Sequence, residues 1–358
     1  MNKYLPALLI TSILGGPSVM ASDVEGLSLY TPDITMEAFA ESLDVGPETQ
    51  NSLPIAQGFW TDMVNSGDIP QDGSGVYVAV LDTGMLPSAP FFFSEANIAW
   101  DLGKGFTHDI YCDGTELVLD EELKSDRGYW TELASGHGTH VASTVVGFNV
   151  NNSFWVEGVA PQATIIPVLV LDAWYVNGEC GEHFFSGGFD DMIASGIRYV
   201  ADLKETELGG APVVINMSLG GPSRSAEIED AVDYAIEKGV IVVASAGNSG
   251  SDGMGYPGGL QQIISAGAAG WASMWEYGWT GDVPEKINQR DILGNNRLFY
   301  LEDFSSRPNK DLDQKHQDLD VSAPGAAVVG PYKSAFAENT SYYYLFGTSM
   351  SAPHVSGM

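Results

Sequence analysis

An aspartate, a histidine and a serine lie far apart in this chain, and together these residue types can cleave an acyl bond. Ser349 follows Gly347 and Thr348 at the start of a run of small residues that predicts a helix. His137 lies between two glycines at the start of a similar run, and Asp82 ends an apolar stretch. A serine hydroxyl is a poor nucleophile at neutral pH unless a base such as histidine accepts its proton. The imidazole in turn needs a carboxylate to fix its tautomer and stabilise the imidazolium.

Each of these motifs has a plainer explanation when it is taken alone. The sequence around Ser349 is also that of an ordinary helix start with a capping serine. Asp82 and the following Thr-Gly also suit a simple turn. A metal pair of His137 with His140 is a further alternative, but no H-E-x-x-H pattern accompanies it. Packing explains a histidine between two glycines poorly, and the three residues together favour catalysis.

Acyl chemistry also needs hydrogen-bond donors aimed at the developing oxyanion. Asn248 follows Ala246 and Gly247 in a glycine-rich turn after a predicted strand, and its side-chain amide is a donor of the right kind. The backbone N–H of Ser349 is the second candidate donor.

The elements that must position these residues alternate between strands and helices. Short apolar runs bounded by turn residues predict buried strands at 76–81, 164–171, 213–217, 240–245 and 263–268. Helical periodicity predicts helices at 189–203 and 226–238, with shorter ones near 36–43 and 57–66. Ser225 is expected to cap the helix at 226–238, Gly239 to end it, and Ile228, Val232, Ala235 and Ile236 to share its buried face.

This alternation predicts an α/β fold, a mostly parallel sheet with helices on both faces. Asp82 and Asn248 would then lie at the carboxyl ends of strands, where open α/β sheets build their sites. Pro167 is awkward inside a central strand, so we expect it at an exposed ladder position.

Composition narrows the class of partner. The chain has 358 residues and is 44% hydrophobic, which suits one large domain with extensions. Its 47 acidic and 15 basic residues give a net charge of −32, which repels phosphates and argues against nucleic-acid partners. A solvated acidic surface explains this charge. Acidic clusters that bind calcium are the more specific alternative.

The first 21 residues have the pattern of a signal peptide. Lys3 precedes a mostly apolar stretch that is too short to span a bilayer, and residues 19–21 form an A-x-A-like cleavage end. We therefore expect a secreted protein with no membrane association after signal removal. Cys112 and Cys180 lack C-x-x-C partners, and an exported protein usually oxidises such a pair, so we expect a disulfide between them.

The motifs together resemble those of the subtilisin-like serine proteases, the subtilases. The order Asp82, His137, Ser349 is the triad order of subtilisin. The matching stretches are Val-Ala-Val-Leu-Asp82-Thr-Gly, Gly-His137-Gly-Thr-His-Val-Ala, Val-Ile-Asn216-Met-Ser-Leu-Gly-Gly, Ala-Ser-Ala-Gly-Asn248 and Gly-Thr-Ser349-Met-Ser-Ala-Pro-His. They appear in the family's order between residues 76 and 358.

The resemblance implies a role for each matching position. Asp82 would orient His137, the general base, and Ser349 would form the acyl-enzyme, while Asn248 would stabilise the oxyanion. The substrate would bind as an extended strand along Ser218, Leu219 and Gly220. Ala246 and Gly247 would form one wall of the pocket that holds the side chain of the substrate residue before the scissile bond. The chemistry would need no cofactor. The family also makes structural calcium an open expectation, although no set of residues here matches a particular site.

The chain also departs from the compact members of the family. Loops at 85–130 and 271–316 would decorate the core, and the tryptophans of the second are expected to pack onto the domain. Residues 22–70 would be a short pro-segment, an extension or the start of the mature chain, and 71–358 the peptidase domain. Because relatives continue past the serine-bearing helix, we expect the domain to extend beyond Met358.

Three functions therefore compete at this stage. The first is a secreted, monomeric endopeptidase that acts on polypeptides. The second is a catalytically impaired relative that binds peptides. The third, an α/β-hydrolase esterase, is disfavoured because the G-x-S-x-G motif is absent and the triad order differs.

Overall fold

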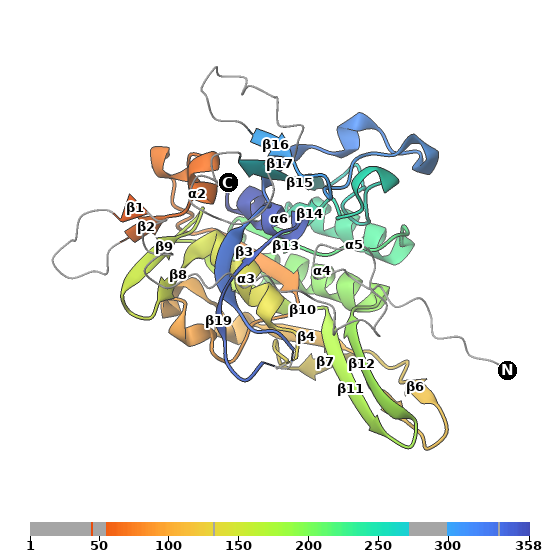
Figure 1. Ribbon diagram of the computed structural model, residues 1–358. Helices are drawn as coiled ribbons and strands as arrows, with labels where there is room; N and C mark the ends of the chain where they lie inside the picture. Colours follow the sequence, from red (N-terminus) through yellow and green to blue (C-terminus); the bar gives the residue numbers. More distant parts are fainter. Residues whose placement is uncertain (1–43, 46–54, 132, 272–298, 336) are drawn as a thin grey trace.

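The structure, a computed structural model, describes residues 44–45, 55–131, 133–271, 299–335 and 337–358. A nine-stranded sheet crosses its centre (Figure 1). β4, β10, β3, β13, β14, β15 and β17 pair in parallel, and β7 and β16 are antiparallel. In sheet order the strands are β16 (Phe299–Leu301), β15 (Ile264–Trp271), β14 (Ile241–Ser245), β13 (Val213–Met217), β3 (Tyr77–Asp82), β10 (Thr164–Leu169), β4 (Lys104–Thr107) and β7 (Lys124–Arg127), with β17 (Val321–Pro324) beside β15.

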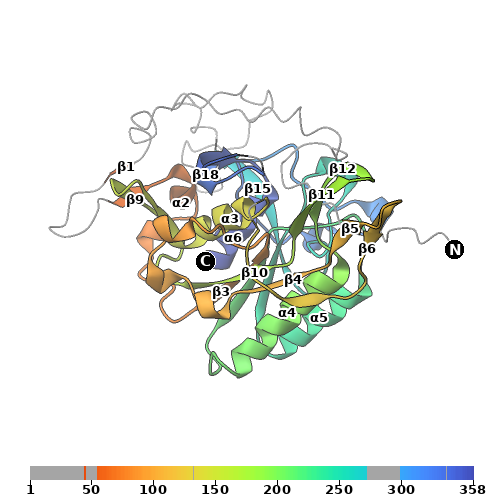
Figure 2. The same ribbon diagram turned by 90° about the horizontal axis from the view of Figure 1, so that it is seen from below.

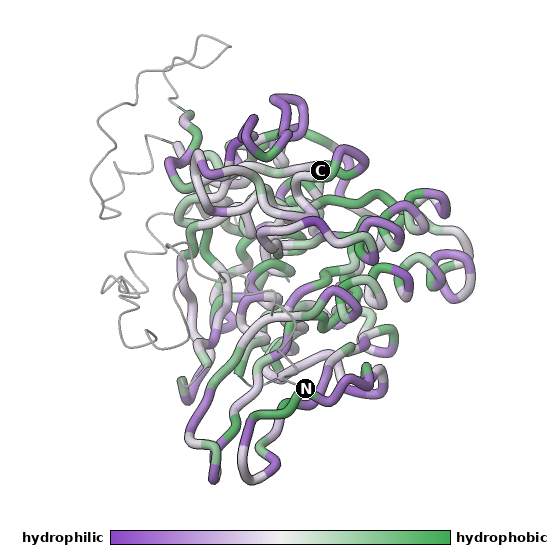
Figure 3. The backbone as a smooth tube through the Cα atoms, turned by 90° about the vertical axis from the view of Figure 1, so that its right-hand side faces the viewer, coloured by the Kyte–Doolittle hydropathy of each residue, from purple (hydrophilic) through white to green (hydrophobic). Residues whose placement is uncertain are grey.

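Helices cover both faces of this sheet, as the alternation of elements predicts (Figure 2). Val78 and Val80 of β3 belong to the core cluster shared with α3 (Gly136–Val146) and α6 (Thr348–Gly357). Ala79 and Leu81 belong to the opposite cluster, shared with α4 (Asp190–Glu205) and α5 (Ala226–Glu237). Figure 3 shows the hydrophobic stretches inside the molecule and hydrophilic turns around it. The predicted α/β class is confirmed.

Smaller elements surround this core. A second sheet has the order β1 (Asp44–Val45), β2 (Ile55–Gln57), β9 (Phe154–Glu157) and β8 (Gly147–Val150). Three hairpins are formed by β5 (Ile110–Cys112) with β6 (Leu117–Leu119), β11 (Asp172–Gly178) with β12 (Gly181–Gly187), and β18 (Val328–Tyr332) with β19 (Ser341–Leu345). A further helix among the described residues is α2 (Phe59–Met63). Short 3₁₀ turns lie at Ser66–Asp68, Ala89–Phe91, Glu95–Asn97, Trp100–Leu102, Gly250–Asp252, Lys310–Leu312 and His316–Asp318.

The predicted strands and long helices agree with the structure to within three residues at each end. Ser225 caps α5 by accepting a hydrogen bond from Ile228 N at 3.5 Å, and Gly239 follows the helix with a φ of 73°. Ile236 was expected on the buried face, and this is wrong, because 36% of it is exposed. Ile236 follows Ile228 by eight residues, so the two side chains are about 80° apart around the helix axis. Ile236 therefore lies at the margin of the apolar stripe.

The prediction that Pro167 is exposed is also wrong. Pro167 is buried and pairs with Val80 in the middle of the sheet. On the other side of β10, pairing with β4 covers only Val168 and Leu169. The ladder to β4 therefore begins just after the proline, at a place where its missing N–H breaks no pairing.

The loops around the two cysteines contain hairpins that periodicity did not reveal. Cys112 ends β5, and Cys180 lies in the tight turn between β11 and β12. The two residues form the expected disulfide, with their Cα atoms 5.8 Å apart. Figure 1 shows β11, β12 and β6 extending together beyond the sheet. The disulfide therefore joins two hairpins through cysteines that are 68 residues apart in sequence.

Several predictions concern residues outside the described part of the chain, namely the signal peptide, the helix near 36–43 and most of the aromatic segment after Trp271. Trp271 itself is buried, and its ring lies 6.0 Å from that of Phe59, as expected for packing onto the domain. Within the described ranges no helix has both the length and the apolarity needed to cross a bilayer.

Candidate active site

The structure brings Asp82 and His137 into direct contact. Asp82 is the last residue of β3, and His137 is the second residue of α3. His137 Nδ1 lies 2.7 Å from Asp82 Oδ1, and both side chains are almost fully buried. The N–H of Thr83 donates to the same oxygen at 2.7 Å. The carboxylate thus orients the imidazole, and Nε2, at the far side of the ring, has no hydrogen-bond partner among the described residues.

The two glycines beside His137 are required by close backbone approach. A Cβ on Gly138 would lie 2.2 Å from the carbonyl oxygen of Gly84, and one on Gly136 would lie 2.3 Å from that of Lys333. Thr83 also fixes the helix start, because its hydroxyl accepts from Gly138 N at 2.9 Å. These contacts explain why the histidine motif contains only small neighbours.

The second histidine of the motif has a different environment. His140 Nε2 lies 3.1 Å from the Val328 carbonyl oxygen and 3.3 Å from that of Tyr343, so its ring joins α3 to the β18–β19 hairpin. Burial lowers the pKa of His140 to about 3 and so keeps its ring neutral. No group of three or more His, Cys, Asp or Glu in the described ranges could hold a metal ion. The alternative of a metal pair with His137 therefore gains no support.

Ser349 lies in the first turn of α6, which packs beside α3 (Figure 1). Its hydroxyl donates to the carbonyl oxygen of Ser218 at 3.2 Å, and the Ser218 hydroxyl donates to the carbonyl oxygen of Ser349 at 2.7 Å. This reciprocal pair fixes the start of α6 to the end of β13. The Ser349 hydroxyl therefore points to Ser218 in this structure and not to His137.

Asn248 is held by the same helix start. Its Oδ1 accepts from both the backbone N–H and the hydroxyl of Thr348, each at 2.9 Å. The Thr348 hydroxyl in turn accepts from Gly247 N at 3.1 Å. Because Oδ1 is occupied, Nδ2 remains the group that can donate elsewhere. The N–H of Ser349 belongs to a first helical turn, where backbone donors lack acceptors within the helix. Sequence reasoning missed Thr348, although it directly precedes the predicted nucleophile.

The predicted substrate-binding residues lie on two adjacent loops. Ser218, Leu219 and Gly220 follow β13, and Ala246 and Gly247 follow β14. The carbonyl oxygen of Leu219 accepts from the Ser245 hydroxyl at 3.1 Å, which ties the two loops together.

A third segment, which sequence reasoning missed, closes this arrangement. Tyr256 exchanges two backbone hydrogen bonds of 2.8 Å with Gly221, and Gly255 N donates to the Ala246 carbonyl oxygen at 2.9 Å. A Cβ on Gly255 would lie 3.3 Å from the Gly221 carbonyl oxygen, so only a small residue fits there easily. The glycine-rich run from 255 to 259 was the available signal.

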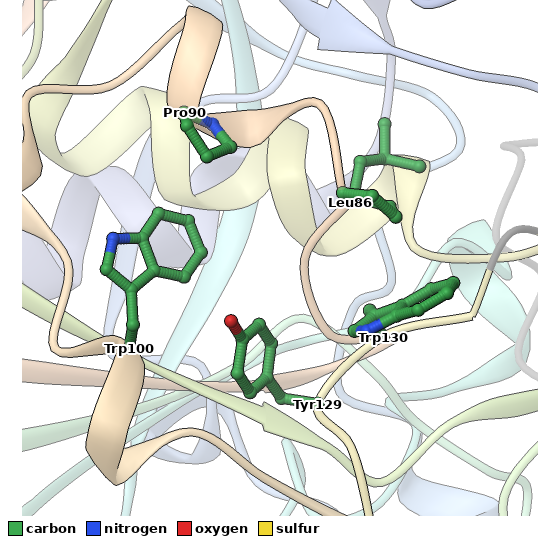
Figure 4. Close-up of a pocket in the computed structure, with 6 residues that line it drawn as sticks. Leu86, Pro90, Trp100, Tyr129 and Trp130 are labelled. Atoms are coloured by element: carbon green, nitrogen blue, oxygen red, sulfur yellow. The ribbon is translucent and has the colours of Figure 1, made fainter.

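A pocket of about 300 Å³ with aromatic side chains in its lining lies beside the segment that follows β3 (Figure 4). The segment just after Asp82 contributes to it, and Met85 N donates to the Tyr129 carbonyl oxygen at 3.0 Å. Burial raises the pKa of Tyr129 and keeps its phenol neutral. The pocket is lined by Leu86, Pro87, Pro90, Trp100, Tyr129 and Trp130.

Comparison with known proteins supports the resemblance seen in the motifs. The model of the subtilase family matches residues 73–358. The chain belongs to the subtilase family. This subtilase is 32% identical over 302 residues to a subtilisin of Bacillus sp. (strain TA39), covering 82% of the chain and 58% of that relative.

Two further comparisons place it within the family. It is 32% identical over 290 residues to the major intracellular serine protease of Bacillus subtilis (strain 168), covering 80% of the chain and 67% of that relative. The solved structure of sphericase matches with a TM-score of 0.54 and 30% identity, covering 80% of this chain and 76% of that one.

Proposed function

We propose that this subtilase is a serine endopeptidase that hydrolyses polypeptides through an acyl-enzyme. The observation that carries the proposal is the buried Asp82–His137 pair, whose free Nε2 belongs to a helix packed against that of Ser349. Burial strengthens the attraction between the carboxylate and an imidazolium, because little water screens it. The carboxylate can therefore stabilise the imidazolium that forms when His137 takes the proton of Ser349, and it keeps the ring oriented.

In the proposed reaction, the Ser349 side chain turns from the Ser218 carbonyl oxygen towards His137. Oγ attacks the carbonyl carbon of the substrate while Nε2 accepts the hydroxyl proton. The tetrahedral intermediate collapses as the C–N bond breaks, and Nε2 passes its proton to the leaving amine. Water then attacks the acyl-enzyme with His137 again as the base, which releases the acid and restores Ser349.

Asn248 is proposed to stabilise the charge that develops in both tetrahedral intermediates. Its Nδ2 and the N–H of Ser349 are the two donors, and Thr348 fixes the amide by donating twice to its Oδ1. The substrate backbone would pair with Ser218, Leu219 and Gly220. The side chain of the substrate residue before the scissile bond would enter between this segment and the loop at 246–247. We further propose that the protein is exported, on the signal-like first 21 residues.

A second candidate function is peptide binding without hydrolysis. The observation that favours it is the Ser349 hydroxyl, which donates to Ser218 and not to His137. In unliganded enzymes, however, catalytic hydrogen bonds are often long or poorly aligned and form only with substrate. The two candidates therefore differ in whether Ser349 is activated.

Active-site labelling distinguishes these functions. The purified protein is incubated with a fluorophosphonate probe beside a Ser349→Ala variant, and the labelled residue is located by peptide mass spectrometry. Labelling of Ser349 in the parent alone, followed by cleavage of casein, is expected for an endopeptidase. A folded parent that binds peptides but takes no label would instead support the peptide-binding function. Ester hydrolysis without casein cleavage would contradict the endopeptidase assignment.

A further inference from the structure

The turn that carries Asn248 is bound along its whole length by a distant segment of the chain. Ser306 N donates to the Gly247 carbonyl oxygen at 2.8 Å, and Ser249 N donates to the Ser306 hydroxyl at 3.0 Å. Gly250 N donates to the Phe304 carbonyl oxygen at 2.8 Å. Arg307 N completes the set by donating to the Gly250 carbonyl oxygen at 2.8 Å. These bonds bracket Asn248 on both sides.

Ser306 makes the central contact with its side chain. The residue is fully buried, and a Cβ on Gly247 would lie 3.0 Å from its Oγ, so the hydroxyl lies directly against the Gly247 backbone. Gly247 has a φ of 104°, in the region that favours glycine. Ser306 therefore bonds to the residue before Asn248 through its backbone and to the residue after it through its hydroxyl.

Asn248 thus has two independent anchors. Thr348 fixes its side-chain amide from the helix that carries Ser349, and Ser306 fixes its backbone from the segment between β16 and β17. An oxyanion donor is effective only when it is held in place before charge develops, and misplacement by about 1 Å can cost 10²-fold in rate. Both anchors are needed if the amide is to keep its position relative to the Ser349 N–H.

We infer that Ser306 is a positioning residue for Asn248, holding its turn so that Nδ2 meets the oxyanion. The inference rests on the proposed function. Ser306 touches neither substrate nor the reacting atoms, and it acts through the turn. Its effect should therefore appear in the rate of acylation and not in substrate affinity.

The first test compares Ser306→Ala with Ser305→Ala. Ser305 is a matched control, because it is also a fully buried serine whose hydroxyl accepts one backbone bond, from Ala268 N at 2.9 Å in β15. Active-site titration corrects each preparation for its folded fraction. We expect Ser306→Ala to lower kcat and the labelling rate constant by about 10-fold with KM unchanged, and Ser305→Ala to change neither by more than about 2-fold.

A double-mutant cycle tests whether the effect passes through Asn248. Asn248→Ala should lower kcat by about 10²–10³, a magnitude known from the corresponding donor of subtilisin itself. In that background Ser306→Ala should change kcat by less than about 2-fold, because the group that it positions is already gone. A full 10-fold loss in the Asn248→Ala background would overturn the inference and indicate a general structural effect. A labelled parent with an unaffected Ser306→Ala variant would overturn the inference alone, whereas an unlabelled parent would overturn it together with the proposed function.

Discussion

The carbonyl oxygen of Ser349 accepts a hydrogen bond from the side chain of Ser218, at 2.7 Å. The helical donor for this oxygen would be the N–H four residues later, but that residue is Pro353, which has none. A buried carbonyl oxygen left without a partner is costly. Ser218 therefore replaces the bond that the proline removes, and it does so at the residue proposed as the nucleophile.

This relationship predicts that Ser218 stabilises the fold mainly by compensating for Pro353. Ser218→Ala should lower the free energy of unfolding by about 1–3 kcal/mol, because it leaves the Ser349 carbonyl oxygen without a donor. In a Pro353→Ala background the restored N–H can donate to that oxygen, so the same change should cost about 1 kcal/mol less. Urea unfolding of the four proteins measures this coupling. Equal costs of Ser218→Ala in both backgrounds would show that the serine does not compensate for the proline.

The sequence predicted the position of a site residue best where that residue ends or closely follows a strand-like apolar run. Asp82 and Asn248 follow apolar runs that could only be buried strands, so their place at the carboxyl edge of the sheet could be predicted. Contacts between distant segments could not be predicted in the same way. Thr348 reaches Asn248 across 100 residues and Ser306 reaches Ser249 across 57, and an isolated serine or threonine carries no sign of such a partner.

Hydrophobic periodicity also failed to predict the hairpin of β11 and β12, for a physical reason. Residues 181–186 of β12 are exposed or half-buried, so this strand shows no alternation between a core face and a solvent face, and its pattern does not distinguish the β11–β12 hairpin from a loop. Pro167 was expected at an exposed position because the extent of pairing to β4 depends on a strand that local sequence did not reveal. Both the β11–β12 hairpin and the buried position of Pro167 depend on packing partners and not on the intrinsic propensities of the residues.

A second prediction concerns the glycine after the histidine. Gly138→Ala would place a Cβ 2.2 Å from the Gly84 carbonyl oxygen, and so would push α3 away from the segment that follows Asp82. We expect kcat/KM to fall by more than about 10²-fold, because His137 moves relative to the carboxylate. Gly128→Ala is the matched control, since its Cβ would meet only the Trp130 ring at 3.7 Å. Comparable activity of the two variants would show that the close approach at Gly138 does not position His137.

The disulfide gives a third prediction. It closes a loop between residues that are 68 positions apart, so its removal should lower stability by about 4 kcal/mol in a chain-entropy account. Replacing Cys112 and Cys180 together with serine should reproduce the melting temperature of the reduced parent. The parent is melted with and without dithiothreitol, beside the double variant. A parent whose melting temperature does not respond to reductant would contradict the predicted stabilisation.

The last prediction is a loss of stability in mild acid, caused by two buried histidines. Burial lowers the pKa of His140 to about 3 and that of His354 to about 4, against an unfolded value of about 6.5. Between these limits the unfolded chain binds more protons than the native one, so stability falls as the pH decreases below about 6.5. Each histidine should contribute a slope of up to about 1.4 kcal/mol per pH unit in this window.

Substitution isolates the contribution of one ring. His140→Gln keeps a side-chain donor that can reach the Val328 carbonyl oxygen but has no proton to bind, so it should reduce the slope of stability between pH 6 and pH 4 by about one proton. His316→Gln is the control, because it makes the same substitution at an exposed histidine. Urea unfolding at closely spaced pH values gives the slopes, which are compared between variants because the many carboxylates contribute to all of them alike. If His140→Gln keeps the slope of the parent, His140 is not the group whose protonation destabilises the native state, and the acid sensitivity must come from elsewhere in the chain.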